Sequence, residues 1–175
     1  MTNQKPESDF NHSQSEQTIP LGMLHWLWLT LLIVVLDQLS KQAASSIMEL
    51  YQPIAITPFF NFTLAHNYGA AFSFLSDAGG WQRYALGAIA LATSIGITVW
   101  LKRLPKNDLW MAVALSLILG GAVGNLYDRA VLGYVVDFID FYWAAYHFPA
   151  FNIADSAITI GAVMMVIDVI RNPGK

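Results

Sequence analysis

The stretch that decides the fold is residues 124–158, GNLYDRAVLGYVVDFIDFYWAAYHFPAFNIADSAI. It lies between two long apolar runs, yet it contains amide, carboxylate and guanidinium side chains: Asn125, Asp128, Arg129, Asp137, Asp140, Asn152 and Asp155. An ionisable side chain at the middle of a membrane costs about 2.5–3.5 kcal/mol on insertion scales. A chain that keeps such residues beside apolar runs is expected to use some of them. We therefore expect two of the acids to carry out chemistry at a membrane surface.

The composition is that of an integral membrane protein. Of the 175 residues, 55% are hydrophobic and only 12% are charged, and the net charge is −3. The length allows one domain, and the lack of a basic surplus argues against a nucleic-acid partner. There is no cysteine, which excludes disulfides, thiolate metal sites, a cysteine nucleophile and anchoring through a lipidated cysteine.

Four apolar runs approach the length of about 20 residues that a membrane-spanning helix needs. Four such runs in so short a chain leave almost no polar face for a soluble bundle. We predict an all-α membrane protein, a bundle of four transmembrane helices in a single integral membrane domain formed by residues 23–175. The expected spans are residues 23–44, 81–101, 109–129 and 153–170. The preceding residues 1–22 are polar and are expected to be a disordered cytoplasmic tail.

The basic residues predict the orientation. The loop at residues 102–107 carries Lys102, Arg103 and Lys106, and the C-terminal segment adds Arg171 and Lys175. By the positive-inside rule this loop and both termini lie in the cytoplasm. The segments that join the other spans then lie outside the membrane on the opposite side.

The two outer segments are predicted to form a small extracytoplasmic β-sheet. Residues 60–64, FNFTL, alternate apolar and polar side chains, which is the period of a half-buried strand. Residues 133–140, GYVVDFID, are a second candidate strand. Residues 69–75, GAAFSFL, are a candidate short interfacial helix.

Helix geometry predicts that polar residues from several segments meet at the outer leaflet or its rim. At a rise of about 1.5 Å per residue, the polar residues of the first and third spans lie roughly 20–30 Å from the inner interface. The fourth span begins near the outer surface with an acid of its own. The converging residues are Asp37, Lys41, Asn67, Asn125, Arg129, Asp137 and Asp155.

Structural roles account for several other polar residues. Asp37 and Lys41 stand four positions apart, which favours an ion pair that supports the bundle. Asp140 is expected to be solvated, and Asp168 to be a polar residue near the cytoplasmic interface. The histidines are scattered and receive no role: His25, His66 and His147.

Asp137 and Asp155 remain as candidates for chemistry. If the two carboxylates face each other, they cannot both ionise cheaply and share one proton. The ionised carboxylate can take a proton from water, and the protonated one can donate to a carbonyl oxygen. This arrangement of an aspartic protease needs no metal, thiol or serine.

Three other classes of function stay open from the residues alone. Intramembrane acids also mark ion paths, so a small transporter or proton channel is one alternative; the second and fourth runs offer it few polar residues between their ends. A non-catalytic assembly or quality-control factor is another. A metallohydrolase is the third, with magnesium on oxygen ligands from Asp137, Asp140, Asn152 and Asp155.

Five motifs, in order, resemble those of the bacterial lipoprotein signal peptidases, the signal peptidase II family. The resemblance covers nearly everything after the polar tail, and five motifs on a four-span frame are highly specific. They are DQLSK at 37–41, NYGAAF at 67–72, GNLYDR at 124–129, VVDFIDF at 135–141 and FNIADS at 151–156.

The resemblance implies an aspartic endopeptidase of the bacterial inner membrane with its active site at the periplasmic side. Members remove the signal peptide from diacylglyceryl-modified prolipoproteins, cutting just before the lipidated cysteine. It implies that Asp137 and Asp155 are the catalytic dyad that activates a water. The implied supporting residues are Asn67, Gly69, Asn125, Arg129 and Asn152, which line the site, and Asp37, Lys41 and Asp128, which hold the polar cluster together.

The resemblance also implies the partners. These are the prolipoprotein substrates, membrane lipid and the cyclic peptide antibiotic globomycin. No cofactor and no metal are expected, and the chain is expected to be a monomer.

Overall fold

The computed structural model describes residues 21–69 and 80–173. All but the last two residues of the predicted disordered tail lie outside the described residues. So do residues 70–75 of the predicted interfacial helix.

Four long helices dominate the described chain, and all four are long and apolar enough to cross a membrane. A short 3-10 turn, η1 (Leu24–Trp26), leads into the first of them. The predicted bundle of four membrane helices is therefore confirmed. The helices are α1 (Leu27–Ile47), α2 (Gln82–Arg103), α3 (Leu109–Val131) and α4 (Ile153–Arg171).

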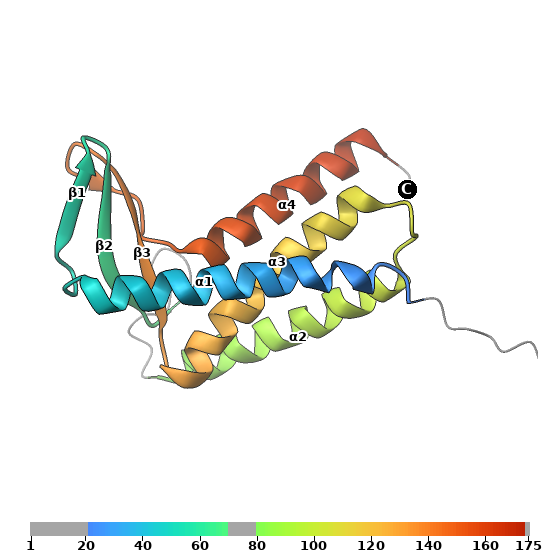
Figure 1. The fold of residues 1–175 in the computed structure, drawn as a ribbon, viewed down its shortest axis with the longest axis horizontal. Helices are drawn as coiled ribbons and strands as arrows, with labels where there is room; N and C mark the ends of the chain where they lie inside the picture. The colour runs from blue at the N-terminus through green and yellow to red at the C-terminus, as the bar shows by residue number, and fades with distance from the viewer. Residues whose placement is uncertain (1–20, 70–79, 174–175) are drawn as a thin grey trace, which may run out of the picture.

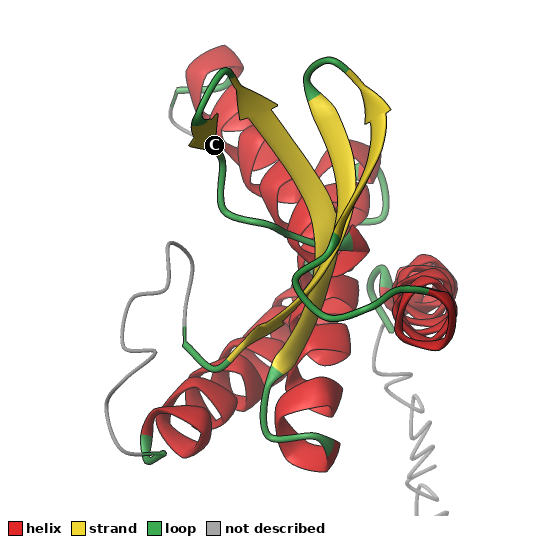
Figure 2. Ribbon diagram, turned by 90° about the vertical axis from the view of Figure 1, so that its left-hand side faces the viewer, coloured by secondary structure: helices red, strands yellow, loops and turns green. Residues whose placement is uncertain are grey.

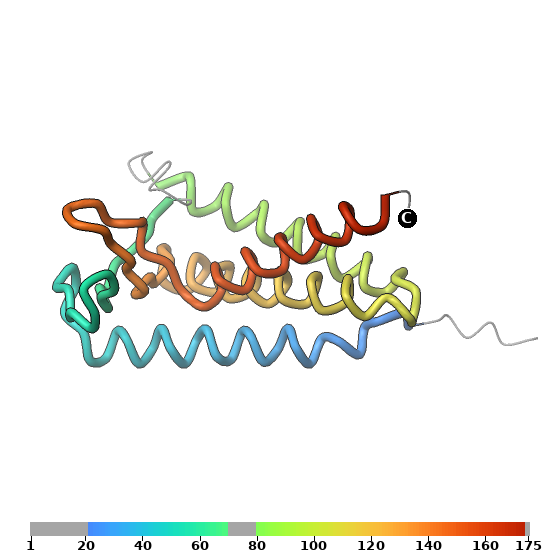
Figure 3. Tube along the Cα trace, turned by 90° about the horizontal axis from the view of Figure 1, so that it is seen from above, coloured from blue at the N-terminus to red at the C-terminus, as the bar shows by residue number. Residues whose placement is uncertain are grey.

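Helix α3 is the centre of the bundle, with α1 and α2 on either side of it and α4 packed against it (Figures 1 and 3). Of its most apolar 18 residues 61% are buried, against 22% in each of the other three helices. Glycines allow the close approach: a Cβ at Gly121 would lie 2.2 Å from the carbonyl oxygen of Ala154, and one at Gly120 would lie 2.7 Å from Ile33. Because nothing larger than hydrogen fits there, α3 fixes where α4 and α1 stand.

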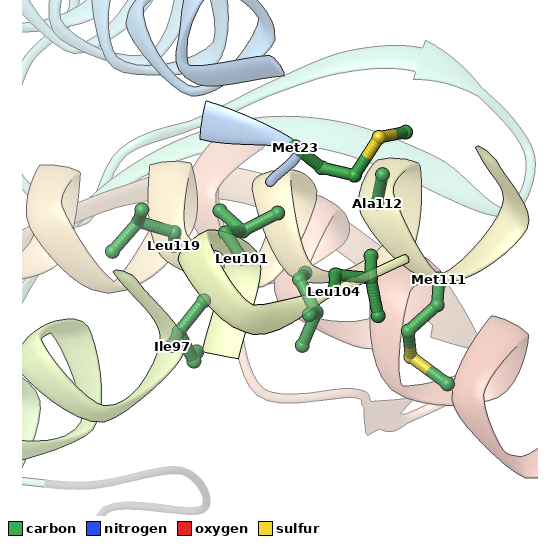
Figure 4. Packing of buried hydrophobic residues seen from close by; sticks show 8 residues of the cluster. Met23, Ile97, Leu101, Leu104, Met111, Ala112 and Leu119 are labelled. Atoms are coloured by element: carbon green, nitrogen blue, oxygen red, sulfur yellow. The ribbon is translucent and has the colours of Figure 1, made fainter. Parts of the chain in front are cut away.

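The larger hydrophobic core fills the end of the bundle away from the sheet (Figure 4). There the backbone N–H of Met23 donates to Leu101 O at 2.9 Å, which joins the start of the described chain to the end of α2. The start of α1, the α2–α3 loop and the end of α4 all lie at this end (Figure 1). The buried members of this core are Met23, Ile97, Leu101, Leu104, Met111, Ala112, Leu115 and Leu119.

A four-stranded antiparallel sheet caps the opposite end of the bundle (Figures 1 and 2). The strand order follows the chain: β1 (Pro53–Thr57), β2 (Phe60–Asn67), β3 (Val135–Trp143) and β4 (Tyr146–His147). The two predicted strands are confirmed as β2 and β3, whereas β1 and β4 were not predicted. Ala65 pairs with Asp137 across β2 and β3, and this register brings the end of β2 beside Asp137.

Asp140 is buried, so the prediction that it is solvated is wrong. Only 5% of it is exposed. Its carboxylate accepts a hydrogen bond from Thr63 Oγ1 at 2.9 Å and lies 2.9 Å from Nδ1 of His147. A buried carboxylate needs such partners. These contacts join β2, β3 and β4, so His147 has a structural partner that the sequence did not reveal.

Candidate active site

A buried lysine is the hub of the polar cluster at the sheet end of the bundle. The ammonium Nζ of Lys41 lies 2.8 Å from carboxylate oxygens of both Asp37 and Asp128, and it donates to Asn125 Oδ1 at 3.0 Å. The Lys41 side chain is 3% exposed, and those of Asp37 and Asp128 are 0% and 1% exposed. Three charges so deeply buried persist because each has partners. The ion pair expected between Asp37 and Lys41 is present, and Lys41 pairs with Asp128 as well.

Gln38 completes this cluster and was missed by the sequence analysis. Its amide Nε2 donates to Asp37 Oδ2 at 3.1 Å and to Asp128 Oδ1 at 2.9 Å. The available signal was its spacing, because an amide three positions before Lys41 shares a helix face with the lysine.

Helix α1 also holds the first turn of α4 in place. Asp37 Oδ1 accepts a hydrogen bond from the backbone N–H of Ala154 at 2.9 Å. Asn152 is the N-cap of α4, and its Oδ1 accepts from the backbone N–H of Asp155 at 2.9 Å. Amide oxygens are favoured caps because the first N–H groups of a helix have no partner within it. The cap fixes the position on α4 from which the Asp155 side chain projects.

Two asparagine amides connect the carboxylates of Asp137 and Asp155. Asn152 Nδ2 donates to Asp137 Oδ1 at 2.7 Å, and Asn125 Nδ2 donates to Asp155 Oδ1 at 2.7 Å. The two amides are themselves in contact, with Asn152 Nδ2 3.3 Å from Asn125 Oδ1. A further donor, Asn67 Nδ2, lies 3.1 Å from the other oxygen of Asp137. Both acids are thus held in fixed orientations within one network.

Arg129 and Gly69 hold Asn67 in place. The guanidinium of Arg129 donates to Gly69 O at 3.0 Å and to Asn125 O at 3.2 Å. The backbone N–H of Gly69 donates in turn to Asn67 Oδ1 at 3.0 Å. With these contacts, all the residues that the resemblance implied for the site belong to one connected set of hydrogen bonds and ion pairs.

Asp137 and Asp155 line the same cavity, which has a volume of about 870 Å³. Its walls come from β2 and β3 of the sheet, from the end of α3, from the segment between β4 and α4, from the first two turns of α4 and from Tyr51 just before β1. Besides the two acids, the lining includes Tyr51, Asn67, Tyr68, Asn125, Arg129, Phe148 and Ile160. A cavity of this size has room for several residues of an extended peptide.

The surroundings of Asp137 keep its proton near neutral pH. Burial, and after it the negative charge of Asp155, raises the pKa of Asp137 from 3.8 to about 7. Hydrogen bonds from Asn67 and Asn152 and the charge of Lys41 act in the opposite direction. Near pH 7 the Asp137 carboxyl can therefore both hold and release a proton, which a surface aspartate cannot.

Comparison with known proteins places the chain in a family. The family model for signal peptidase (SPase) II matches residues 29–171. The chain belongs to the signal peptidase II family. The family is one of aspartic peptidases, so membership makes the chain a membrane peptidase of lipoprotein processing, and the resemblance read from the five motifs is confirmed.

Individual relatives agree with the signal peptidase II assignment. A lipoprotein signal peptidase of Pseudomonas syringae pv. tomato is 55% identical over 154 residues, which are 87% of this chain and 89% of the relative. One from Alteromonas mediterranea is 56% identical over 152 residues, 87% of this chain and 84% of the relative. A solved bacterial membrane enzyme, determined by the in meso method, has a TM-score of 0.74 and is 32% identical; the match covers 86% of this chain and 90% of that one.

Proposed function

We propose that this peptidase removes the signal peptide from diacylglyceryl-modified prolipoproteins, cutting just before the lipidated cysteine, with Asp137 and Asp155 as its catalytic pair. One observation carries the proposal. Both acids line a single cavity, and their carboxylates are joined through the touching amides of Asn125 and Asn152.

The chemistry follows from one proton shared by two carboxyl groups. The ionised carboxylate accepts a proton from a water molecule as the water oxygen attacks the scissile carbonyl carbon, and the neutral carboxyl donates its proton to the carbonyl oxygen. In the second half, the carboxyl that took the water's proton passes it to the leaving nitrogen as the C–N bond breaks, and the other carboxylate takes a proton from a hydroxyl of the tetrahedral intermediate, which restores the starting pair. The pKa of about 7 for Asp137 suits this exchange at neutral pH.

The neighbouring residues orient the pair and the substrate. Asn67, Asn125 and Asn152 fix the two carboxylates by direct hydrogen bonds. Arg129 lines the cavity and uses two of its five N–H donors on backbone carbonyls. Within residues 21–69 and 80–173 its other donors have no acceptor, so they can serve a carbonyl oxygen of the substrate.

We also propose that the cavity opens on the extracytoplasmic side of the bacterial inner membrane, with both termini in the cytoplasm. The sheet, whose strands β2 and β3 line the cavity, lies at the end of the bundle opposite the α2–α3 loop (Figure 1), and that loop region carries Lys102, Arg103 and Lys106. Basic residues mark the cytoplasmic side. A diacylglyceryl group anchored in the outer leaflet holds the scissile bond at the depth of Asp155, the third residue of α4.

The test is cleavage of a purified diacylglyceryl-prolipoprotein in detergent. Asp137→Asn and Asp155→Asn are expected to lower kcat by at least about a thousandfold, because each removes a group that moves a proton. Asp168→Asn is the matched control, since it changes a buried aspartate of α4 far from Asp155 and is expected to retain activity. Cleavage at the wild-type rate by either dyad variant would remove that residue from the mechanism.

Two further assays separate this proposal from its alternatives. Cleavage in excess chelator is expected to continue, which is not expected of a magnesium hydrolase using the oxygen ligands considered above. Of those ligands, Asp140 bonds to Thr63 and His147 and is absent from the described cavity lining. Globomycin is expected to inhibit competitively, and a monomer in detergent is expected to be active because one chain supplies the whole network.

A further inference from the structure

Tyr51 has a backbone conformation that its side chain disfavours. Its φ is +59°, in the left-handed region. It lies in a turn that the N–H of Gln52 closes by donating to Glu49 O at 3.2 Å, and at this position of such a turn glycine or asparagine is usual. A bulky residue in this region costs on the order of 1–3 kcal/mol. Retaining a tyrosine here indicates that its side chain has a use.

The Tyr51 side chain stands at the mouth of the catalytic cavity together with two other exposed aromatic rings. Tyr51, Tyr68 and Phe148 all line the cavity, and they are 59%, 47% and 54% exposed. By contrast Asp137, on the cavity floor, is 2% exposed. We call these three side chains the aromatic rim. The cavity therefore has a polar floor and an apolar mouth.

Another part of the cavity lining lies on a membrane helix. It follows α4 from Asp155 to Ile160, which is about 7.5 Å along the helix axis. Ile160 is 54% exposed, and α4 is one of the membrane helices. The cavity thus connects the two acids with the hydrocarbon region, and the aromatic rim lines this same cavity.

We propose that the aromatic rim is a specificity site that binds the acyl chains of the diacylglyceryl group carried by the substrate; this inference rests on the proposed function. The cysteine next to the scissile bond must lie near the polar floor, so its lipid leaves through the apolar mouth. Aromatic rings pack well against acyl chains, and tyrosine suits the membrane interface because its ring is apolar and its hydroxyl is polar.

The test compares two substrates that share one peptide sequence, one carrying an S-dipalmitoylglyceryl and the other an S-diacetylglyceryl group. The diacetyl substrate keeps both ester groups and lacks the long chains. The variants are Tyr51→Gly, Tyr51→Phe and Phe148→Ala, with Trp143→Ala as the control, because Trp143 is 81% exposed and lies outside the described cavity lining. Each variant is compared with wild type on the same substrate, so micelle partitioning of the substrate cancels.

For Tyr51→Gly we expect KM for the dipalmitoyl substrate to rise about fivefold to tenfold with kcat unchanged, because apolar burial against the chains is lost. KM for the diacetyl substrate is expected to change less than about twofold. The same variant is expected to unfold no more easily than wild type, because glycine relieves the strained φ. Tyr51→Phe and Trp143→Ala are expected to have the KM values of wild type. Phe148→Ala is expected to raise KM for the dipalmitoyl substrate as Tyr51→Gly does.

Two results would overturn the inference. An equal rise in KM for both substrates would assign the rim to the peptide, and an unchanged KM for both would show that the rim does not contact the substrate. Failure of the proposed function has a different signature, which is absence of cleavage by wild type or retained cleavage by Asp137→Asn.

Discussion

Replacing Asp137 by asparagine is expected to abolish activity and yet stabilise the folded protein at alkaline pH. The raised pKa carries this prediction. Burial and the charge of Asp155 raise the pKa of Asp137 from 3.8 to about 7. Between these values the folded protein binds the proton and the unfolded chain does not, so the free energy of unfolding falls as pH rises through this window. Above about pH 7 the folded protein carries the whole cost of a buried charge.

The magnitude follows from the same pKa difference. At about 1.4 kcal/mol per pKa unit, the raised pKa of Asp137 lowers the free energy of unfolding by about 4 kcal/mol at pH 8, where the folded protein holds a buried charge, and by about 2 kcal/mol at pH 5, where it must bind a proton that the unfolded chain does not. Asparagine removes this cost. It also loses about 1 kcal/mol, because its NH2 group cannot accept the hydrogen bond from Asn67. The net gain is about 3 kcal/mol at pH 8 and about 1 kcal/mol at pH 5.

The assay is unfolding by sodium dodecyl sulfate in mixed micelles, followed by tryptophan fluorescence; the chain has six tryptophans. Wild type and Asp137→Asn are compared at pH 5 and pH 8, with proteolytic activity measured on the same samples. A variant that is less stable than wild type at pH 8, or whose gain does not grow between pH 5 and pH 8, would refute the reasoning. Either result would mean that the surroundings of Asp137 do not raise its pKa.

Two further predictions concern the support of the dyad. Gly124→Ala is expected to destabilise the protein by about 1–3 kcal/mol in thermal unfolding and to lower activity, because the new Cβ would lie 2.6 Å from the fixed carboxylate of Asp37. Gly96→Ala is the control, because Gly96 lies on a helix with open space around it. In the same measurement this control should be neutral or stabilising. Asn67→Ala removes a donor that stabilises ionised Asp137, so the pKa of Asp137 rises and the alkaline limb of the kcat/KM profile should move to higher pH. An unmoved limb would show that another group sets it.

Much of the bundle could be predicted from the sequence, because its signals are local. An apolar run of about 20 residues is stable in a membrane as a helix. The alternation of apolar and polar side chains in residues 60–64 predicts a strand. The ion pair of Asp37 and Lys41 could be predicted for the same reason, since four positions on a helix bring side chains together. These features depend on neighbours along the chain.

The predictions that failed depend on partners far away in sequence. Asp140 read as a solvated acid because its donor Thr63 is 77 residues earlier and belongs to another strand. Gln38 lay inside a motif, yet its bond to Asp128 spans 90 residues. No periodicity reports such pairings. The motif resemblance supplied the site residues because a family pattern already contains the long-range contacts.

The hydrogen bond from Ala154 to Asp37 has a consequence for biogenesis. Asp37 and Lys41 belong to the first of the four helices, and their mutual pairing offsets both charges before the later helices are made. Asp128 arrives with the third span, and only the last span brings the amide that occupies the free oxygen of Asp37. The nascent protein consequently has no assembled proteolytic centre until α4 has joined the other helices, which delays peptide hydrolysis until all four helices are in place.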